Sequence, residues 1–107
     1  MIRLLFVCTG NTCRSSMAEA IARLHLSTGL LEGIHVSSAG TGAIPDEPAS
    51  AHSCAVMQEL SLDLSAHRAR LLTPELVRDA DLILVMTWRQ RQHIRSEERR
   101  VGKQCRY

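Results

Sequence analysis

The chain has 107 residues, of which 45% are hydrophobic, 22% are charged and only 3% are aromatic, a composition typical of one globular domain with an aliphatic core. Five of the 13 basic and two of the 11 acidic residues lie in residues 95–107, which leaves residues 1–94 with a net charge of −1. The chain therefore lacks the basic footprint of a nucleic-acid-binding domain, and no apolar run reaches the length of a transmembrane helix.

The first residues do not form a secretory signal. The apolar run Met1–Cys8 is too short for one and has no small-residue cleavage site. We therefore expect a cytoplasmic protein, in which the four cysteines favour thiol chemistry over a disulfide framework. The five histidines show no metal-ligand spacing, so neither a metal nor another cofactor is expected.

A strand followed by a helix is predicted at the start of the chain. The strand is Ile2–Val7, an apolar run broken only by Arg3. Ser15 or Ser16 can cap the helix, and Ser16 and Glu19 have the spacing of a capping box. The apolar residues of this helix recur at helical intervals, at Met17, Ile21 and Leu24. The helix is expected to end at Gly29 or Gly33.

The rest of the chain alternates strands and helices. The predicted elements are a strand at Ile34–Ala39, a loop at Gly40–Pro48, a helix at Ala49–Leu60, an ambiguous stretch at Leu62–Leu72, a helix that starts at Thr73-Pro74-Glu75, a strand at Leu82–Met86 and a helix from Trp88 onward. This alternation predicts one α/β domain with a parallel sheet and right-handed crossovers.

The segment V-C-T-G-N-T-C-R-S-S, Val7–Ser16, joins the first strand to its helix. In open parallel sheets, ligands bind beyond the carboxyl ends of the strands, and a loop before a helix N-terminus directs its amides toward an anion. Gly10 permits backbone angles that other residues resist, and Asn11 is among the few residues that tolerate the left-handed region. The segment is therefore predicted to form an oxyanion cradle.

The side chains of this cradle suit phosphoryl transfer to sulfur. Cys8 is expected at its floor, where the amides and the helix dipole would stabilise a thiolate. Arg14 can offer a planar fork to phosphate oxygens, and Ser15 can donate its hydroxyl to the sulfur. A C-x5-R spacing alone is a weak signal, because free cysteines are usually buried hydrophobes, but the preceding strand and the following helix strengthen it. No G-K-[ST] follows, which excludes a Walker loop.

The loop C-T-G-N-T-C-R-S, Cys8–Ser15, resembles the active-site loop of the low-molecular-weight protein tyrosine phosphatase family. Further segments resemble family segments in family order, namely Met17–Glu19, Val36–Thr41, Leu62–Arg70 and Ala80–Met86. The resemblance covers residues 1 to about 94. It implies a three-layer, flavodoxin-like α/β fold with an open parallel sheet of strand order 2-1-3-4, whose last strand and helix are missing here.

The resemblance implies a metal-free mechanism with a phosphocysteine intermediate. By motif, Cys8 is the nucleophile, Arg14 binds the phosphoryl group and Ser15 assists the thiolate. Asn11 shapes the loop, and Cys13 is a second loop cysteine that could form a protective disulfide with Cys8 under oxidation. The implied partner is a phosphorylated protein substrate, and we expect a monomer. The substrate-binding residues would be Thr9, Gly10, Asn11, Thr12, Cys13 and Arg14.

Two loop residues depart from the pattern of the tyrosine phosphatases. Ser16 stands where the family usually has proline, and a serine also suits a helix start. Thr12 stands where tyrosine phosphatases commonly have an apolar residue, and the loop with Thr12 resembles the bacterial protein-arginine phosphatase branch. An apolar wall suits a phenyl ring, whereas a smaller polar Thr suits a guanidinium. We therefore expect phosphoarginine in preference to phosphotyrosine as the substrate.

Residues 95–107 are expected to be a non-native tail. The stretch R-S-E-E-R-R-V-G-K-Q-C, Arg95–Cys105, resembles the translation of a common short-read sequencing adapter and differs from it only at Gln104. The alternative is a solvated basic helix end. If residues 95–107 are such a tail, residues 1–94 form a partial phosphatase domain. This domain ends before the Asp-Pro loop that carries the general acid in the family. No aspartate here precedes a proline, so we expect a marginally folded and nearly inactive chain.

Two other functions remain open. A thioredoxin-coupled arsenate reductase shares the loop and the fold but needs two further redox cysteines, and Leu82–Ile94 contains none. A non-catalytic phosphate-binding fragment is the other alternative, although the presence of both Cys8 and Arg14 argues against it. Outside the loop, His67 is expected to be a structural hydrogen-bonding residue, and Trp88 to lie either at the mouth of the site or in the core.

Overall fold

The computed structural model describes residues 2–26 and 33–101, and the side chains of residues 2–26 and 33–96. Its sheet has the order β2-β1-β3, and both pairings are parallel. The strands are β1 (Ile2–Cys8), β2 (Ile34–Gly40) and β3 (Leu82–Val85). The predicted strand order is thereby confirmed for these three strands, and the predicted ends of β1 and β2 are each one residue short.

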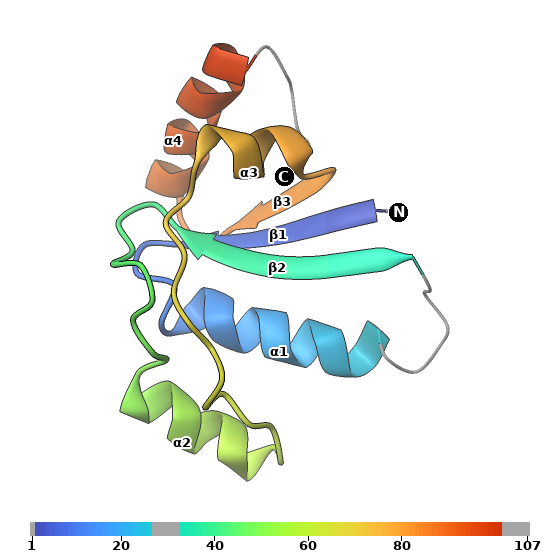
Figure 1. Cartoon of the computed structure of the whole chain (residues 1–107), viewed down its shortest axis with the longest axis vertical. Coiled ribbons are helices and arrows are strands. Elements are labelled where there is room, and N and C mark those ends of the chain that lie inside the picture. Colours follow the sequence, from blue (N-terminus) through green and yellow to red (C-terminus); the bar gives the residue numbers. More distant parts are fainter. Residues whose placement is uncertain (1, 27–32, 102–107) are drawn as a thin grey trace.

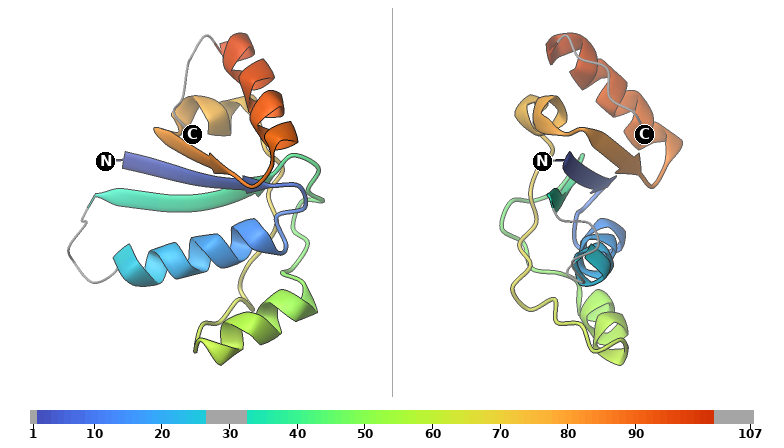
Figure 2. Two further views of the ribbon diagram at one scale, coloured as in Figure 1. Left: turned by 180° about the vertical axis from the view of Figure 1, so that it is seen from behind. Right: turned by 90° about the vertical axis from the view of Figure 1, so that its right-hand side faces the viewer.

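Helices cover both faces of this sheet (Figure 1, Figure 2). One face carries α1 (Arg14–Leu26), with α2 (Ala51–Glu59) beyond it, and the other carries α3 (Pro74–Asp79) and α4 (Trp88–Val101). The predicted three-layer α/β fold is confirmed. Among the helices in the described residues, none combines the length and the apolar character that crossing a membrane would need.

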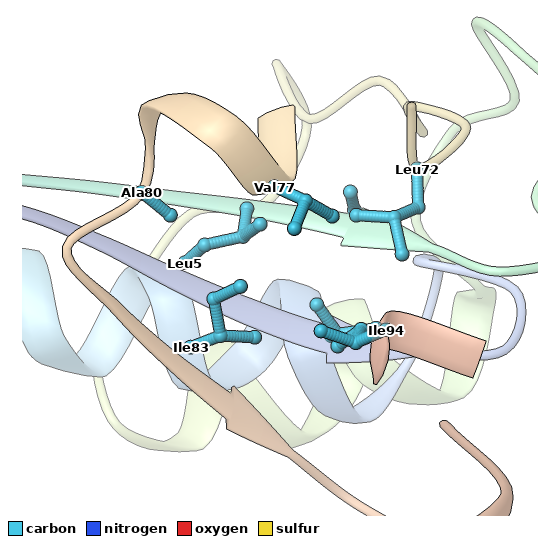
Figure 3. Packing of buried hydrophobic residues seen from close by; sticks show 8 residues of the cluster. Leu5, Leu72, Val77, Ala80, Ile83 and Ile94 are labelled. Carbon is cyan, nitrogen blue, oxygen red and sulfur yellow. The ribbon is translucent and has the colours of Figure 1, made fainter. Parts of the chain in front are cut away.

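The core between the sheet and the pair α3 and α4 follows from strand alternation. Leu5 and Val7 of β1 are buried with Ile83 of β3, because residues two apart share a face and Leu5 is in register with Ile83. Val77 of α3 and Ile94 of α4 close this cluster from the other side (Figure 3). A second, smaller cluster around Met57 and Leu64 packs α2 against α1. The aliphatic core expected from the composition is therefore present, in two parts.

The start of α1 differs from the prediction. The helix begins at Arg14, so Ser15 and Ser16 lie within its first turn and do not cap it. Ser16 donates its hydroxyl to the Cys13 carbonyl at 2.7 Å, and Glu19 accepts a hydrogen bond from Ser38, so no capping box forms. The loop residues are held by tertiary contacts, and these replace the local cap. Of the two predicted helix ends, Gly29 lies outside the described residues, and Gly33, with φ of 87°, directly precedes β2.

α3 begins at its predicted signal, whereas α2 begins two residues after the predicted Ala49. Ser50 caps α2, and its hydroxyl oxygen accepts a hydrogen bond from the Ser53 N–H. Thr73 caps α3 in the same way, with Pro74 at the first helical position. The ambiguous stretch Leu62–Leu72 has no helix or strand, and isolated bridges attach it at Leu71 and Arg68.

The last helix runs through the boundary predicted near Ile94. α4 continues to Val101, and Ile94 is fully buried against the core. The assignment of residues 95–107 to a non-native tail stays a prediction, and residues 102–107 with Cys105 lie outside the described part of the chain.

Candidate active site

Cys8 is the last residue of β1, and its sulfur is buried beneath the loop that leads into α1. The Asn11 N–H donates a hydrogen bond to Cys8 Sγ at 3.1 Å. Ser15 Oγ lies 2.7 Å from the same sulfur. The loop therefore places a backbone amide and a hydroxyl around one sulfur at the N-terminal end of a helix, an arrangement that stabilises negative charge there.

Asn11 organises this loop. Its backbone has φ of 57°, so the prediction that Asn11 takes the left-handed conformation is confirmed. Its side-chain nitrogen donates to Ser15 Oγ at 2.9 Å and to Ser38 Oγ at 2.8 Å, while its side-chain oxygen accepts from the Arg70 N–H at 2.8 Å. Because Ser15 Oγ accepts from Asn11, the hydrogen of the Ser15 hydroxyl is available to the sulfur of Cys8.

A chain of hydrogen bonds runs from α1 through β2 to the sulfur. Ser38 of β2 donates its hydroxyl to Glu19 Oε1 at 2.9 Å and accepts from Asn11. Asn11 in turn donates to Ser15, which contacts Cys8. Each group in this chain orients the next, so the carboxylate of Glu19 fixes the direction of the donors that reach the sulfur.

Two residues of the stretch after α2 also hold the loop. His67 Nε2 lies 2.6 Å from the Asn11 carbonyl oxygen, and because a carbonyl only accepts, His67 donates. Arg70 contributes its backbone N–H to Asn11 and its Nε to the Ser38 carbonyl at 3.3 Å. The prediction that His67 is a structural hydrogen-bonding residue is confirmed. Sequence reasoning missed the role of Ser38 and Arg70, since each lies far from the loop in the sequence.

The first turn of α4 reaches the other side of the loop. Gln90 is 2% exposed, and its Oε1 accepts from the N–H groups of Met86 and Thr87, both at 2.9 Å. Thr87 Oγ1 accepts from the Gln90 N–H, which completes a capping box. Gln90 Nε2 then donates to Thr9 Oγ1 at 3.2 Å. The T-x-x-Q spacing of Thr87 and Gln90 could have predicted this cap, but not the bond to Thr9.

The remaining loop residues are more exposed than Asn11 and Ser15. Arg14 is exposed at the first position of α1, and Cys13 and Thr12 are half-buried. Cys13 and Cys8 are both free thiols. The Thr12 carbonyl accepts from the Ser50 N–H at 2.9 Å, which joins the loop to the start of α2.

The special backbone angles expected at Gly10 are not found, its substrate-binding role stays a prediction, and a different glycine is needed for close approach. Gly10 does not adopt a positive φ, and a Cβ there would lie 3.5 Å from Thr12 Oγ1, an ordinary contact. At Gly40, the last residue of β2, an added Cβ would collide with the Thr9 carbonyl oxygen and lie 3.0 Å from the Asn11 nitrogen. The loop packs directly on the end of β2, so a side chain at residue 40 would displace it.

The exposed Trp88 is not core filler. Its side chain is 61% exposed, and the guanidinium of Arg91 lies over its ring at 4.8 Å from the centroid. The core alternative for Trp88 is therefore wrong, and a position at the mouth of the site stays a prediction.

This arrangement places donors that stabilise an anion around the sulfur of Cys8, at the N-terminal end of the helix whose first residue is Arg14. A thiolate held in this way can attack an electrophile bound above the loop, and the arginine fork suits a phosphate. The described residues contain no group of three histidine, cysteine or carboxylate side chains placed to hold a metal ion.

Comparison with known proteins identifies the same architecture. A family model described as "Low molecular weight phosphotyrosine protein phosphatase" matches residues 3–107. The "Probable low molecular weight protein-tyrosine-phosphatase EpsP" of Ralstonia nicotianae is 47% identical over 93 residues, which cover 87% of this chain and 61% of that protein. The "Protein-arginine-phosphatase" of Bacillus subtilis is 43% identical over 96 residues, which cover 88% of this chain and 61% of that protein.

A solved structure shares the fold and the sequence. The YwlE arginine phosphatase, in a mutant with a phosphorylated active site serine, superposes with a TM-score of 0.85 at 39% identity. The match covers 92% of this chain and 64% of that one. The chain thus spans about three fifths of the length of the curated relatives that it matches.

Proposed function

We propose that this chain, which belongs to the low molecular weight phosphotyrosine protein phosphatase family, transfers a phosphoryl group from a phosphorylated protein side chain to Cys8 and then to water. The observation that supports this most is the position of Cys8 Sγ, which receives the Asn11 N–H at 3.1 Å and lies 2.7 Å from Ser15 Oγ. A sulfur surrounded by donors at a helix N-terminus is suited to form, and to leave as, a thiolate.

The proposed reaction has two steps. Arg14 and the amides of the loop residues Thr9–Cys13 bind the phosphoryl oxygens, and the Cys8 thiolate attacks phosphorus. The bond from phosphorus to the leaving oxygen or nitrogen breaks, the leaving group takes up a proton, and a phosphocysteine forms. Water then attacks phosphorus, which releases phosphate and returns the electron pair of the S–P bond to Cys8, assisted by Ser15. The phosphorylated active site serine of the YwlE mutant supports such a covalent intermediate.

We further propose that departure of the leaving group is slow in this chain. None of its aspartates precedes a proline, so it contains no Asp-Pro general acid. A positioned acid contributes about 10²–10⁴-fold to a proton-transfer step. An unactivated phenol or guanidine would therefore leave slowly, whereas 4-nitrophenol, which departs without a proton, would leave readily.

The test is to trap the phosphoenzyme. With 4-nitrophenyl phosphate, we expect rapid release of nitrophenolate and a phosphoryl group on the peptide that contains Cys8, detected by mass spectrometry after acid quenching. Cys8→Ser should abolish the release, and Arg14→Ala should slow it by at least about 100-fold, because the phosphoryl group loses its bidentate partner. Cys54→Ser, at a free cysteine of α2 outside the loop, is the matched control and should retain the phosphocysteine. Binding of phosphate with no phosphocysteine would leave only the non-catalytic alternative.

Substrate preference is proposed to depend on Thr12. The relatives do not decide it, since a tyrosine-phosphatase and an arginine-phosphatase are similarly identical to this chain. Thr12 is half-buried in the loop, next to Gly10. We expect Thr12→Ile to lower the ratio of phosphoarginine to phosphotyrosine hydrolysis by about tenfold, because an apolar wall favours a phenyl ring. An unchanged ratio measured in both proteins would remove Thr12 as the determinant.

Other parts of the proposal follow from the same reading. We propose a phosphorylated protein as the partner, a monomeric state in dilute solution and a cytoplasmic location. We also propose no thiol-linked arsenate reduction, since Leu82–Ile94 contains no cysteine. Arsenate-dependent oxidation of the chain's thiols would contradict the last point.

A further inference from the structure

A cavity of ≈ 640 Å³ is lined by residues of α1, of β2 and of the segment 62–70. This segment runs from α2 toward α3 (Figure 1, Figure 2). Arg23 and Leu24 line its α1 side, and Arg68 and Arg70 line the opposite side. None of residues 8–15 lines it, so the cavity is separate from the space above Cys8. Its volume is in the range of sites for small organic molecules.

The cavity is lined by three arginines and two carboxylates, and one of these arginines, Arg23, is paired with Glu19. Glu19 accepts from Ser38 and lies 3.6 Å from Arg23, so one acidic and one basic group compensate each other. Asp63 accepts from the N–H and hydroxyl of Ser65, at 2.8 and 3.0 Å. The hydrogen bond from the Ser65 N–H, and to a lesser degree that from its hydroxyl, lower the pKa of Asp63 and stabilise its ionised form.

Arg68 and Arg70 are held in place by backbone carbonyls. Arg68 Nη1 donates to the carbonyls of Ser65 and His67, at 3.2 and 2.7 Å, and Arg70 Nε donates to that of Ser38 at 3.3 Å. In the part of the chain that the structure describes, neither guanidinium forms an ion pair. With Glu19 paired to Arg23 and Asp63 ionised, the three arginines and two carboxylates leave the lining with one net positive charge. Two oriented guanidinium groups on one wall of such a cavity favour an anion there.

The rest of the wall suits an uncharged body. Leu24 is 50% exposed on α1, where Ala20 also lines the cavity, and the half-buried Leu62 lies on the facing segment with Ala66. Covering these exposed apolar side chains with the carbon skeleton of a ligand would remove apolar surface from water and stabilise the complex. An inorganic ion alone would leave them exposed.

We propose that this cavity binds a small organic anion, whose carboxylate or phosphate groups pair with Arg68 and Arg70 and whose body covers Leu24 and Leu62. The same anion would act on the loop at Cys8. His67 and Ser38 line the cavity and bond Asn11, and Arg70 donates to Asn11 through its own backbone. An anion that draws the Arg70 side chain toward itself changes the support of Asn11, and so couples the cavity to the sulfur.

Binding is tested by titrating the full chain with citrate and, separately, with phenylphosphonate, while amide chemical shifts are followed by NMR. We expect saturable shifts in residues 19–24, 35–38 and 62–70. The anion that binds more tightly there identifies the preferred charged group. Shifts confined to residues 8–16, or an absence of saturable shifts with both anions, would overturn the proposal.

Matched variants locate the charge. Arg68→Gln combined with Arg70→Gln should raise the dissociation constant at the cavity by at least about tenfold, because two charge-assisted hydrogen bonds are lost. Arg68→Gln alone removes a guanidinium that bonds two backbone carbonyls near the surface, and should give a smaller increase. This single variant guards against misfolding of the double variant. Arg78→Gln removes the same charge on α3, outside the cavity, and should leave the constant unchanged. Equal weakening by Arg78→Gln would contradict a built site.

Coupling between the cavity and Cys8 is measured by the reactivity of the Cys8 thiol and not by turnover. Failure of this test is therefore distinguishable from failure of the proposed function. The rate of alkylation of Cys8 by iodoacetamide, followed on its own peptide, should change by at least about twofold when the cavity is saturated. The double arginine variant should lose this change. The same change in that variant would mean that the anion acts at the loop itself, and would overturn the coupling.

Discussion

Asn11 is the residue on which the geometry of the loop most depends. Its N–H contacts Cys8 Sγ, and its side chain uses both donors and its acceptor on Ser15, Ser38 and the Arg70 N–H. It is fully buried. A buried amide with every polar atom paired stabilises one conformation, because any other arrangement leaves a polar group without a partner.

Asn11→Ala should lower the free energy of unfolding by about 2–4 kcal/mol, since the Arg70 N–H loses its acceptor and an alanine is strained at positive φ. The measurement is urea denaturation followed by circular dichroism. Ser61→Ala is the matched control, because Ser61 also has a positive φ, 59°, but is exposed. If both variants lose the same stability, the side-chain network of Asn11 contributes little.

At the scale of elements, the loop is held between the end of β2 and the first turn of α4. Gly40 ends β2 in direct contact with the Thr9 carbonyl, and Gln90 caps α4 and bonds Thr9. The cap satisfies N–H groups that a helix start otherwise leaves unpaired. One side chain thus joins the start of a helix to the loop, and the position of α4 and the shape of the loop depend on each other.

Gln90→Ala should destabilise the chain by about 1–2 kcal/mol and speed hydrogen exchange at the Thr87 amide, because that N–H loses its acceptor. The Met86 amide should change less, since it also lies 3.2 Å from the Val7 carbonyl oxygen. Native-state hydrogen exchange by NMR measures both. Gln92→Ala makes the same substitution at an exposed position of α4. Equal exchange at Thr87 in the two variants would show that the cap is not needed.

At the scale of the whole molecule, the sheet is narrow and its core is divided. One cluster lies between the sheet and the pair α3 and α4, and the other lies between α1 and α2. In the described residues β3 pairs only with β1, so its other edge has unpaired backbone groups. Leu84 of that strand is 36% exposed. An apolar edge strand of this kind promotes association with other chains.

Leu84→Lys should weaken self-association at high concentration by at least about tenfold, because a charge on an edge strand opposes pairing with a second sheet. Sedimentation equilibrium over a range of concentrations measures it. Leu60→Lys adds the same charge at the end of α2, where the leucine is 56% exposed and no strand edge is near, and should have no effect. A wild-type chain that stays monomeric at every concentration would contradict the role of the edge.

Local signals predicted most of the elements and failed at one helix start. Thr73 and Pro74 predicted α3 because an N-cap hydroxyl and an N1 proline act within one turn. Ser16 and Glu19 had an equally good local pattern, but Glu19 is used by Ser38 and Arg23. A local cap is worth only about 1 kcal/mol, so several tertiary hydrogen bonds outweigh it.

The sequence by itself determined the alternating strands and helices and the loop of Cys8, Arg14 and Ser15, because hydrophobic period and motif spacing act over a few residues. Only the tertiary structure decided what holds that loop. The loop is bonded by Ser38, Arg70 and Gln90, which lie 27, 59 and 81 residues along the sequence from their partners in it. Such bonds depend on the parallel register of β1 with β2 and on the path of the chain between α2 and α3, which no local pattern specifies.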